Sequence, residues 1–131
     1  MLNNVQSMDG IMIFLCGVYS AGFAIFHSQF WRIFHWKNDL SKLLPANKAI
    51  IQISNLRLIY FFVFVAAICF IFPDQLLNTS LGRFFMGGMS LFWLGRTIEQ
   101  FIFLRIDHPL VHLLTYLFLV GAMLFAIPLL L

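Results

Sequence analysis

The sequence predicts an all-α integral membrane protein, an antiparallel bundle of four transmembrane helices. Of its 131 residues, 62% are hydrophobic and only 10% are charged, whereas a soluble domain carries about 25% charged residues. The apolar residues form four long runs, and one spanning helix needs roughly 20 mainly apolar residues. These runs lack the period-2 alternation of barrel strands, the other structure that can cross a bilayer. The four spans fill almost the whole chain, so we expect a single domain, residues 1–131.

The first predicted span covers residues 10–34. No Lys or Arg occurs from Met1 to Asp9, and a cleavable signal peptide needs a basic segment at its start. We therefore expect this helix to remain in the mature protein. A polar cytoplasmic loop, residues 35–47, follows the span. Leucines in this loop predict a short interfacial helix that is broken by Pro45.

Three further spans are predicted after this loop. A proline followed by an acidic residue ends the second span, and a hydroxyl side chain provides an N-cap for the third. A proline in the first turn, where its missing N–H would have no partner, starts the fourth. The spans cover residues 48–72, which end before Pro73; 80–104, which are capped by Thr79 or Ser80; and 108–131, which start at His108 or Pro109.

The basic residues predict the orientation of the bundle. Of the eight Lys and Arg residues, only Arg83 lies near the side of the membrane that also holds both termini. Because Lys and Arg favour cytoplasmic loops, we expect both termini outside, in a bacterial inner membrane. The basic residues form no patch interleaved with aromatic residues, so no nucleic-acid partner is expected. The residues on the predicted cytoplasmic side are Arg32, Lys37, Lys42, Lys48, Arg57, Arg96 and Arg105.

Each predicted span has one face on which polar and small residues gather, and we expect these faces to point inward. Small residues let membrane helices approach closely. On the third span, Gly88 and Gly95 predict such a contact strip next to Glu99. The four faces comprise Gly17, Ala21, Ala24 and Ser28; Gln52, Asn55, Ile59 and Ala66; Arg96, Glu99, Gln100 and Phe103; and His108, His112, Thr115, Leu119, Ala122 and Ala126.

Polar side chains from all four spans reach a common depth. With a rise of about 1.5 Å per residue, His27, Asn55, Glu99 and His112 each lie roughly 6–10 Å inside the cytoplasmic boundary. Ionisable groups inside a membrane are costly unless they are paired, and they mark functional candidates. The sequence therefore predicts a functional site in the cytoplasmic half of the bundle.

The histidines suggest a metal centre at this depth. His108 and His112 lie one helical turn apart, a spacing that can hold one metal ion. His27 and Glu99 would complete a set of two or three imidazoles and one carboxylate, which suits iron, zinc or manganese. Two histidines from facing helices could instead bind a haem. In the alternative interpretation, His108 only caps the start of its helix.

The remaining polar residues suggest ligand binding and proton transfer. Arg96 could hold an anionic headgroup or substrate, while Glu99 and His112 act as catalytic groups. Asn55, Gln52 and Gln100 are candidate ligand contacts. In the alternative interpretation, Arg96 and Glu99 only neutralise each other, and the amides only form hydrogen bonds between helices.

Three functions follow from these residues. The first is a site for a metal, a haem, or a lipophilic or anionic ligand, which a membrane-embedded enzyme acting on a lipid could use. The second is a small proton-coupled transporter in which Glu99 carries the proton. The third is a non-catalytic subunit of a membrane complex, in which the polar layer fixes the register of the helices.

Four short spans with one buried glutamate resemble the small multidrug transporters, which work as dimers. In that family the glutamate lies in the first span, whereas Glu99 lies in the third, and the histidines have no counterpart. The resemblance is limited to overall size, and no residue carries over. Besides the lipid bilayer, we expect a homodimer or another membrane protein as a partner.

The two cysteines, Cys16 and Cys69, fall in the outer half of consecutive spans and have no metal-binding spacing. We expect free thiols that pack like small apolar residues. A disulfide bridge between them is the alternative.

Overall fold

The computed structural model describes the backbone of residues 2–131 and the side chains of residues 8–131. This part of the chain is helical and contains no strand, which confirms the all-α prediction. The chain divides into two compact parts, Gly17–Ile68 and Met1–Cys16 together with Cys69–Leu131. Each part is described by itself.

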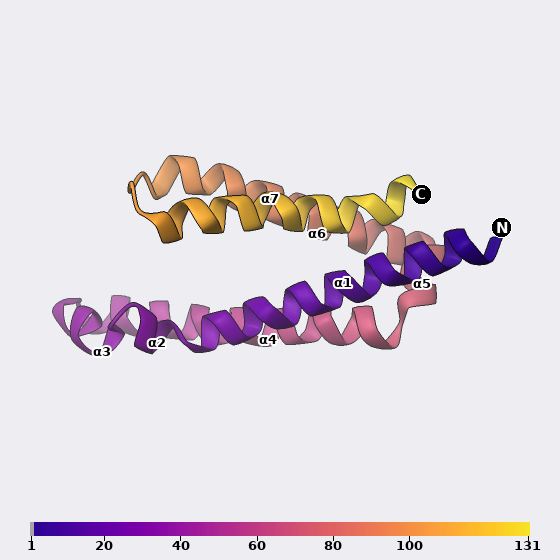
Figure 1. The fold of residues 1–131 in the computed structure, drawn as a ribbon. Coiled ribbons are helices and arrows are strands. Elements are labelled where there is room, and N and C mark those ends of the chain that lie inside the picture. The colour runs from indigo at the N-terminus through magenta and orange to yellow at the C-terminus, as the bar shows by residue number, and fades with distance from the viewer. Residues whose placement is uncertain (1) are drawn as a thin grey trace. The chain divides into compact units, whose positions relative to one another are not determined.

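Four long helices and several short ones make up the chain (Figure 1). Three long helices contain stretches that are apolar enough to cross a membrane: Met8–Ser28, Pro45–Ile71 and Pro109–Leu130. They correspond to the first, second and fourth predicted spans, and they indicate an integral membrane protein. The elements are α1 (Leu2–Ser28), α2 (Phe30–Ile33), α3 (Trp36–Asp39), the 3-10 helix η1 (Leu40–Lys42), α4 (Pro45–Ile71), α5 (Pro73–Asn78), α6 (Ser80–Phe103) and α7 (Pro109–Leu130).

The end of the first helix differs from the prediction. α1 stops at Ser28 instead of continuing to residue 34, because Gln29 adopts a non-helical conformation and α2 starts after it. The predicted interfacial helix corresponds to α3 and η1. They follow His35, which has a left-handed backbone conformation with φ 52°. Pro45 starts α4, where the fixed φ of proline suits the first helical position.

The third and fourth predicted helices start as their capping residues indicate. The Thr79 hydroxyl accepts a hydrogen bond from the Gly82 N–H at 2.9 Å, and Pro109 is the first residue of α7. The sequence does not predict α5, because Pro73 before Asp74 also marks the end of a span. Proline at the start of a helix is equally favourable, and α5 uses it in this way.

In the part Gly17–Ile68, the second half of α1 packs against α4 through aromatic rings. The ring centroid of Phe62 lies 5.9 Å from that of Phe23 and 5.2 Å from that of His27. Two residues of the predicted small-residue face, Gly17 and Ala24, are buried, whereas Ser28 of the same face is exposed. The predicted face is therefore correct only towards its N-terminal end.

In the other part, α6 and α7 run antiparallel and pack along their lengths (Figure 1). Their core contains Met86, Trp93 and Phe125, and the Trp93 ring stacks on Phe118 with centroids 5.6 Å apart. Three hydrogen bonds link α6 side chains to α7 carbonyl oxygens along the pair: Arg83 to Leu129 at 2.9 Å, Ser90 to Ala122 at 2.7 Å and Gln100 to Val111 at 3.3 Å.

The first half of α1 belongs to the same part and contacts α7 at a proline. Pro128 lies inside α7 and is buried. Because proline has no N–H, it leaves the carbonyl of Leu124, four residues earlier, without its helical donor. The Cys16 thiol donates a hydrogen bond to this oxygen at 3.2 Å. Cys16 and Cys69 are both free thiols, as we expected from the sequence.

This contact predicts that the effects of Cys16→Ala and Pro128→Ala depend on each other. In the wild-type chain, Cys16→Ala leaves the Leu124 carbonyl without a donor. In a Pro128→Ala background the alanine N–H can serve this carbonyl, so the same substitution should cost less. We expect a coupling energy of about 0.5–1 kcal/mol in a double-mutant cycle of unfolding in detergent. An equal cost of Cys16→Ala in both backgrounds would contradict this contact.

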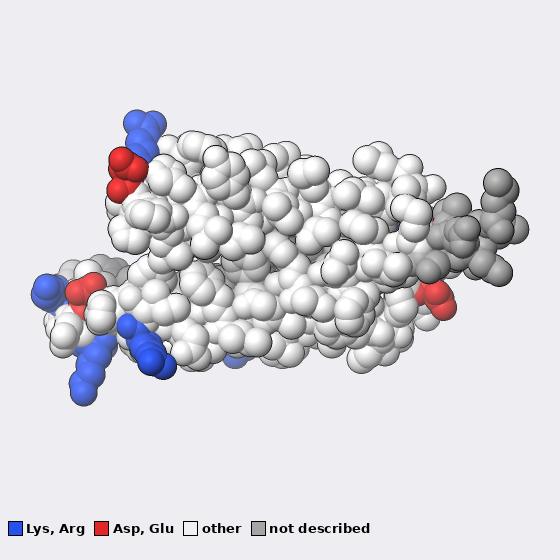
Figure 2. All heavy atoms as spheres, in the orientation of Figure 1, with Lys and Arg blue, Asp and Glu red and all other residues white. Residues whose placement is uncertain are grey.

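The outer surfaces of the helices are apolar. Large hydrophobic side chains are strongly exposed along them, such as Phe84 at 81% and Tyr116 at 70%. On the face shown in Figure 2, Lys and Arg gather where the part Gly17–Ile68 carries α2 and α3. In the other part, the turn from α6 to α7 carries Arg105 close to Asp107, and Figure 2 shows blue and red atoms side by side there. Exposed apolar surface of this extent marks contact with a membrane or another protein.

Candidate functional site

Asn55 of α4 is bound to His27 of α1 by two hydrogen bonds. Its amide Nδ2 donates to the main-chain oxygen of His27 at 2.9 Å, and its Oδ1 lies 2.9 Å from His27 Nδ1. Because the amide oxygen can only accept, this contact places a proton on His27 Nδ1. The carbonyl of His27 lies in the last turn of α1, where helical donors are missing. Asn55, which is 3% exposed, therefore caps α1.

A second pair lies beside the first. Trp31 Nε1 donates a hydrogen bond to Gln52 Oε1 at 2.9 Å, and Gln52 Nε2 donates to the Lys48 carbonyl at 3.3 Å. These contacts match the interpretation of Gln52 and Asn55 as residues that link helices. Their role in ligand binding stays a prediction.

Arg96 and Glu99, three residues apart on α6, have different surroundings. The Arg96 guanidinium lies over the Phe118 ring, 4.7 Å from its centroid, which is a favourable cation–π geometry. Glu99 is exposed, contrary to the expectation that it points inward. In the described part of the chain the two residues form no ion pair. Their mutual neutralisation over a longer distance stays a prediction.

The predicted contact strip of Gly88 and Gly95 is not used in the packing of α6 against α7. A Cβ atom placed on either glycine would meet no other atom within 4 Å. The buried face of α6 is formed instead by larger residues: Met86, Met89, Trp93, Thr97 and Gln100. Because consecutive helical residues are 100° apart, the burial of Gln100 turns Glu99 away from α7.

The two histidines of α7 have different partners. His108 caps the helix, since its Nδ1 accepts a hydrogen bond from the Leu110 N–H at 3.1 Å. His112 Nε2 lies 2.8 Å from a carboxylate oxygen of Asp107. The alternative interpretation of His108 as a capping residue is therefore confirmed.

These positions do not support the predicted metal centre. Within residues 8–131, no group of three or more His, Cys, Asp or Glu side chains is placed to hold a metal ion. His108 and His112 use ring nitrogens for the helix cap and the carboxylate. His27 belongs to the other part of the chain, so a set that joins it to Glu99 and His112 stays a prediction.

A pocket of about 480 Å³ lies at the turn between α6 and α7. It contains two of the predicted site residues, Gln100 and His112. Three further polar residues line it, together with apolar residues that supply the rest of the wall. The complete lining is Gln100, Phe101, Leu104, Arg105, Ile106, Asp107, Val111, His112 and Thr115.

Gln100 is the deepest polar residue of this pocket. Its side chain is 2% exposed, and its Nε2 donates to the Val111 carbonyl at 3.3 Å. This contact fixes the orientation of the amide, since only the NH₂ group can donate to a carbonyl. The Oε1 atom is buried and has no hydrogen-bond partner among the described residues.

The charged residues lie at the rim of the pocket. Arg105, Asp107 and His112 are all exposed, and the Arg105 Nε donates to the Phe101 carbonyl at 3.0 Å. Thr115 is half-buried, and its hydroxyl donates to the Val111 carbonyl at 2.9 Å. The rim of the pocket thus carries the Arg105 guanidinium and the His112–Asp107 pair.

Sequence reasoning missed Arg105 and Asp107 as site residues. Both lie between two predicted spans, where charged residues are ordinary membrane-flanking groups. A cluster of polar residues in a short turn between two long helices was the available signal. This cluster marks a site because Gln100 and Thr115 line the same pocket.

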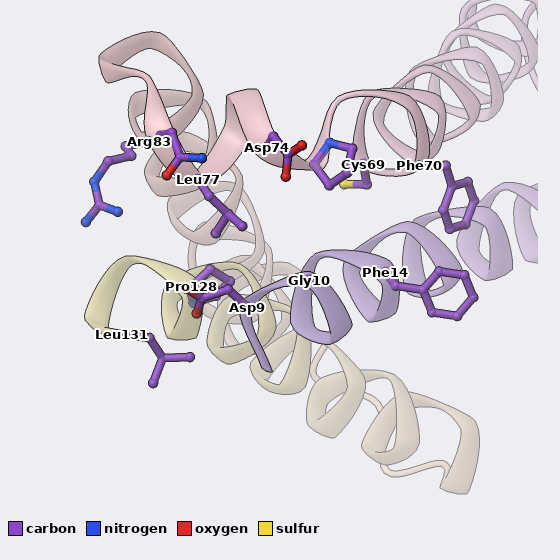
Figure 3. Close-up of a pocket in the computed structure, with 12 residues that line it drawn as sticks. Asp9, Gly10, Phe14, Cys69, Phe70, Asp74, Leu77, Arg83, Pro128 and Leu131 are labelled. Carbon is purple, nitrogen blue, oxygen red and sulfur yellow. The ribbon is translucent and has the colours of Figure 1, made fainter. Parts of the chain in front are cut away.

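A larger pocket, of about 1040 Å³, lies in the part that contains α5, α6 and α7. It is found at the end of this part opposite to the α6–α7 turn. In Figure 3, Asp74 and Leu77 point from α5 towards the side of the pocket that carries Gly10 of α1. Arg83 also lines this pocket, but it donates to the Leu129 carbonyl near the end of α7. There it compensates carbonyl groups that lack helical donors, which gives it a structural role.

Comparison with known proteins gives no relative. No protein-family model, curated protein or solved structure matches the chain. The function is therefore argued from the geometry of the site.

Proposed function

We propose that the protein is a four-span membrane protein that binds the polar head of an amphipathic anion in the α6–α7 pocket. The observation that carries this proposal is the composition of the pocket lining, in which the Arg105 guanidinium at the rim lies beside the exposed apolar side chains of Phe101 and Ile106. A cationic group next to apolar surface suits a ligand with an anionic head and an apolar body.

The pairing of α6 with α7 supports a fourth span. α7 is long and apolar enough to cross a membrane. α6 begins beside the end of α7, where Arg83 contacts Leu129, and ends beside its start, where Gln100 contacts Val111. If α7 crosses the bilayer, α6 crosses the same thickness next to it. The polar residues of α6 lower its hydropathy, but Gln100 and Thr97 face inward.

Four spans would place the α6–α7 turn on the same side of the membrane as the loop that contains α3. Both segments carry basic residues, and basic loops favour the cytoplasm. The pocket then opens at the cytoplasmic surface of the membrane. This is the level at which lipid headgroups lie, and the apolar residues beside the pocket face the acyl chains.

The chemistry of the pocket favours an anionic head joined to an apolar body. Arg105 offers a charged guanidinium, which binds phosphate and carboxylate groups. Phe101 and Ile106 are exposed beside the pocket at 64% and 55%, so they can contact an apolar chain. A membrane phospholipid combines both features.

Substitution of Arg105 should weaken the binding of this lipid. Native mass spectrometry of the protein, purified in mild detergent with phosphatidylglycerol, should show one retained lipid per chain. Arg105→Ala removes a charge-assisted contact of about 1.5 kcal/mol, so we expect retention to fall about tenfold.

Glu99→Gln and Arg57→Ala serve as controls for this experiment. Glu99 is exposed on α6 next to Gln100, and Arg57 is an exposed basic residue on α4. Both variants should retain the lipid as the wild type does. If the wild type retains no lipid, or if Arg57→Ala weakens retention as much as Arg105→Ala does, the pocket is not the binding site.

A further inference from the structure

Two side chains of opposite charge lie on the outer faces of the long helices. Glu99 is exposed on α6, and the burial of Gln100 beside it turns Glu99 away from α7. Arg57 is exposed on α4 and lies about 200° around the helix from Asn55. Because Asn55 contacts α1, Arg57 points away from α1. Among the residues that the structure describes, neither Glu99 nor Arg57 forms an ion pair.

Both charges lie in the cytoplasmic half of the proposed spans. Arg57 follows Lys48 by nine residues, and Glu99 precedes Leu104 by five. At about 1.5 Å per residue, these positions lie roughly 14 Å and 8 Å from the cytoplasmic boundary. An arginine inside a membrane extends its side chain towards the nearer surface, so the Arg57 guanidinium reaches the level of the Glu99 carboxylate.

Charges at this depth are costly when they face acyl chains. Charged side chains within a membrane pair with each other or with other polar groups. In the described part of the chain, Arg96 forms no ion pair with Glu99, and its guanidinium lies over an aromatic ring of α7. The Arg57 guanidinium lies 5.6 Å from the centroid of the Tyr60 ring, which is no substitute for a carboxylate. Glu99 and Arg57 each require a partner of opposite charge.

The face of α6 that carries Glu99 also contains two glycines. Gly88 and Gly95, here called the glycine strip, lie within about 40° of Glu99 around the helix. A Cβ atom added to either glycine would meet no other atom within 4 Å. Large exposed side chains flank the strip, among them Leu91 and Ile102. Small residues of this kind let a second helix approach closely.

The face of α4 that carries Arg57 is raised instead. Tyr60 and Phe64 are exposed on it, and their rings stack with centroids 6.0 Å apart. They follow Arg57 by three and seven residues, so all three share one face. From the cytoplasmic boundary outward, α4 presents a basic residue and then two aromatic rings, while α6 presents an acidic residue and then two glycines. The two faces are complementary in charge and in shape.

We infer that two copies of the chain associate through these faces. Arg57 of one chain pairs with Glu99 of the other, and the aromatic rings of α4 pack on the glycine strip of α6. In the proposed four-span topology α4 and α6 cross the membrane in opposite directions, so the two charges meet at the cytoplasmic end. One chain carries both faces, and a two-fold dimer requires a surface that complements itself. The inference rests on the proposed function only in treating α6 as a span.

Reversal of either charge should separate the two chains. Energy transfer between donor-labelled and acceptor-labelled chains in phosphatidylcholine vesicles measures the dimer. In Glu99→Arg and in Arg57→Glu, every contact between the two positions joins like charges, which repel each other. We expect the dissociation constant of either variant to rise by about a hundredfold or more.

A mixture of the two variants tests the pairing itself. When a Glu99→Arg chain meets an Arg57→Glu chain, each contact again joins an acidic and a basic side chain. Energy transfer between the two should return to nearly the wild-type level, which would also show that both variants are folded. Lys48→Glu is the control, since Lys48 is an exposed basic residue in the first turn of α4. Its mixture with Glu99→Arg should show no recovery.

A bulky side chain on the glycine strip gives a second test that changes no charge. Gly95→Leu should abolish energy transfer, because the aromatic rings of α4 can no longer approach α6. Gly22→Leu is the control, since Gly22 is an exposed glycine of α1 whose added Cβ would also meet no other atom within 4 Å. This control should dimerise as the wild type does.

Wild-type chains that stay monomeric in the vesicles would overturn the inference. So would recovery in a single chain that carries both charge reversals but not in the mixture, because the ion pair would then form within one chain. The lipid pocket lies within one chain, so Arg57→Glu should still retain phosphatidylglycerol at the α6–α7 turn. Loss of the dimer and failure of the proposed lipid site are thereby distinguished.

Discussion

Replacement of Gly82 by alanine is expected to lower the free energy of unfolding by about 3 kcal/mol. Gly82 lies in the first turn of α6, where this helix contacts α5. An added Cβ would lie 2.2 Å from the main-chain oxygen of Gln75 and 2.5 Å from the Cα of Leu76. Both are backbone atoms and cannot rotate away, so the two helices would have to separate. Overpacking of this kind costs typically 1–3 kcal/mol, and occasionally more.

The loss can be measured by thermal or denaturant unfolding in detergent, monitored by circular dichroism. Gly88→Ala is the matched control, since it introduces the same methyl group on the same helix. No atom lies within 4 Å of its added Cβ, and alanine favours a helix over glycine by up to about 1 kcal/mol. This variant should be neutral or stabilised. Equal stabilities of the two variants would contradict the contact between α5 and α6.

Replacement of Asn55 by leucine is expected to cost about 2 kcal/mol. The substitution removes two hydrogen bonds, one to the main-chain carbonyl and one to the ring Nδ1 of His27. Loss of a buried hydrogen-bond partner costs about 1–3 kcal/mol in soluble proteins, and hydrogen bonds between membrane helices average about 0.6 kcal/mol. The expected value lies between these limits, because two bonds are lost at one site.

Asn47→Leu is the control for this variant. Asn47 lies in the first turn of the same helix and is exposed. Unfolding in mixed micelles should give a near wild-type stability for Asn47→Leu and a clear loss for Asn55→Leu. If the two substitutions cost the same, Asn55 does not hold α1 against α4.

The helices could be predicted because their signals are local. Long apolar runs locate the spans, and the Thr79 cap and Pro109 locate two helix starts. The break after Ser28 could not be predicted, since no proline or glycine occurs there and the change at Gln29 is a matter of backbone conformation. α5 was missed because a proline can end one helix and start the next, and sequence alone does not distinguish these uses.

The site could be predicted only in part. Periodicity groups Arg96, Glu99 and Gln100 on one broad face of α6, but it does not say which of them touches α7. Packing decides this, because Trp93 stacks on Phe118 and so turns Gln100 inward and Glu99 outward. The unpaired oxygen of Gln100 depends on its contact with Val111, which connects residues of two helices and leaves no trace in the sequence.

Photo-crosslinking tests the binding pocket most directly. A phosphatidylglycerol with a photoactivatable group next to its head would be incubated with the purified protein, irradiated and mapped by peptide mass spectrometry. We expect the label on residues 100–115, around the α6–α7 turn, and much less of it on Arg105→Ala. Label that falls mainly on the basic segment 32–48, or evenly along all helices, would show that the lipid binds elsewhere.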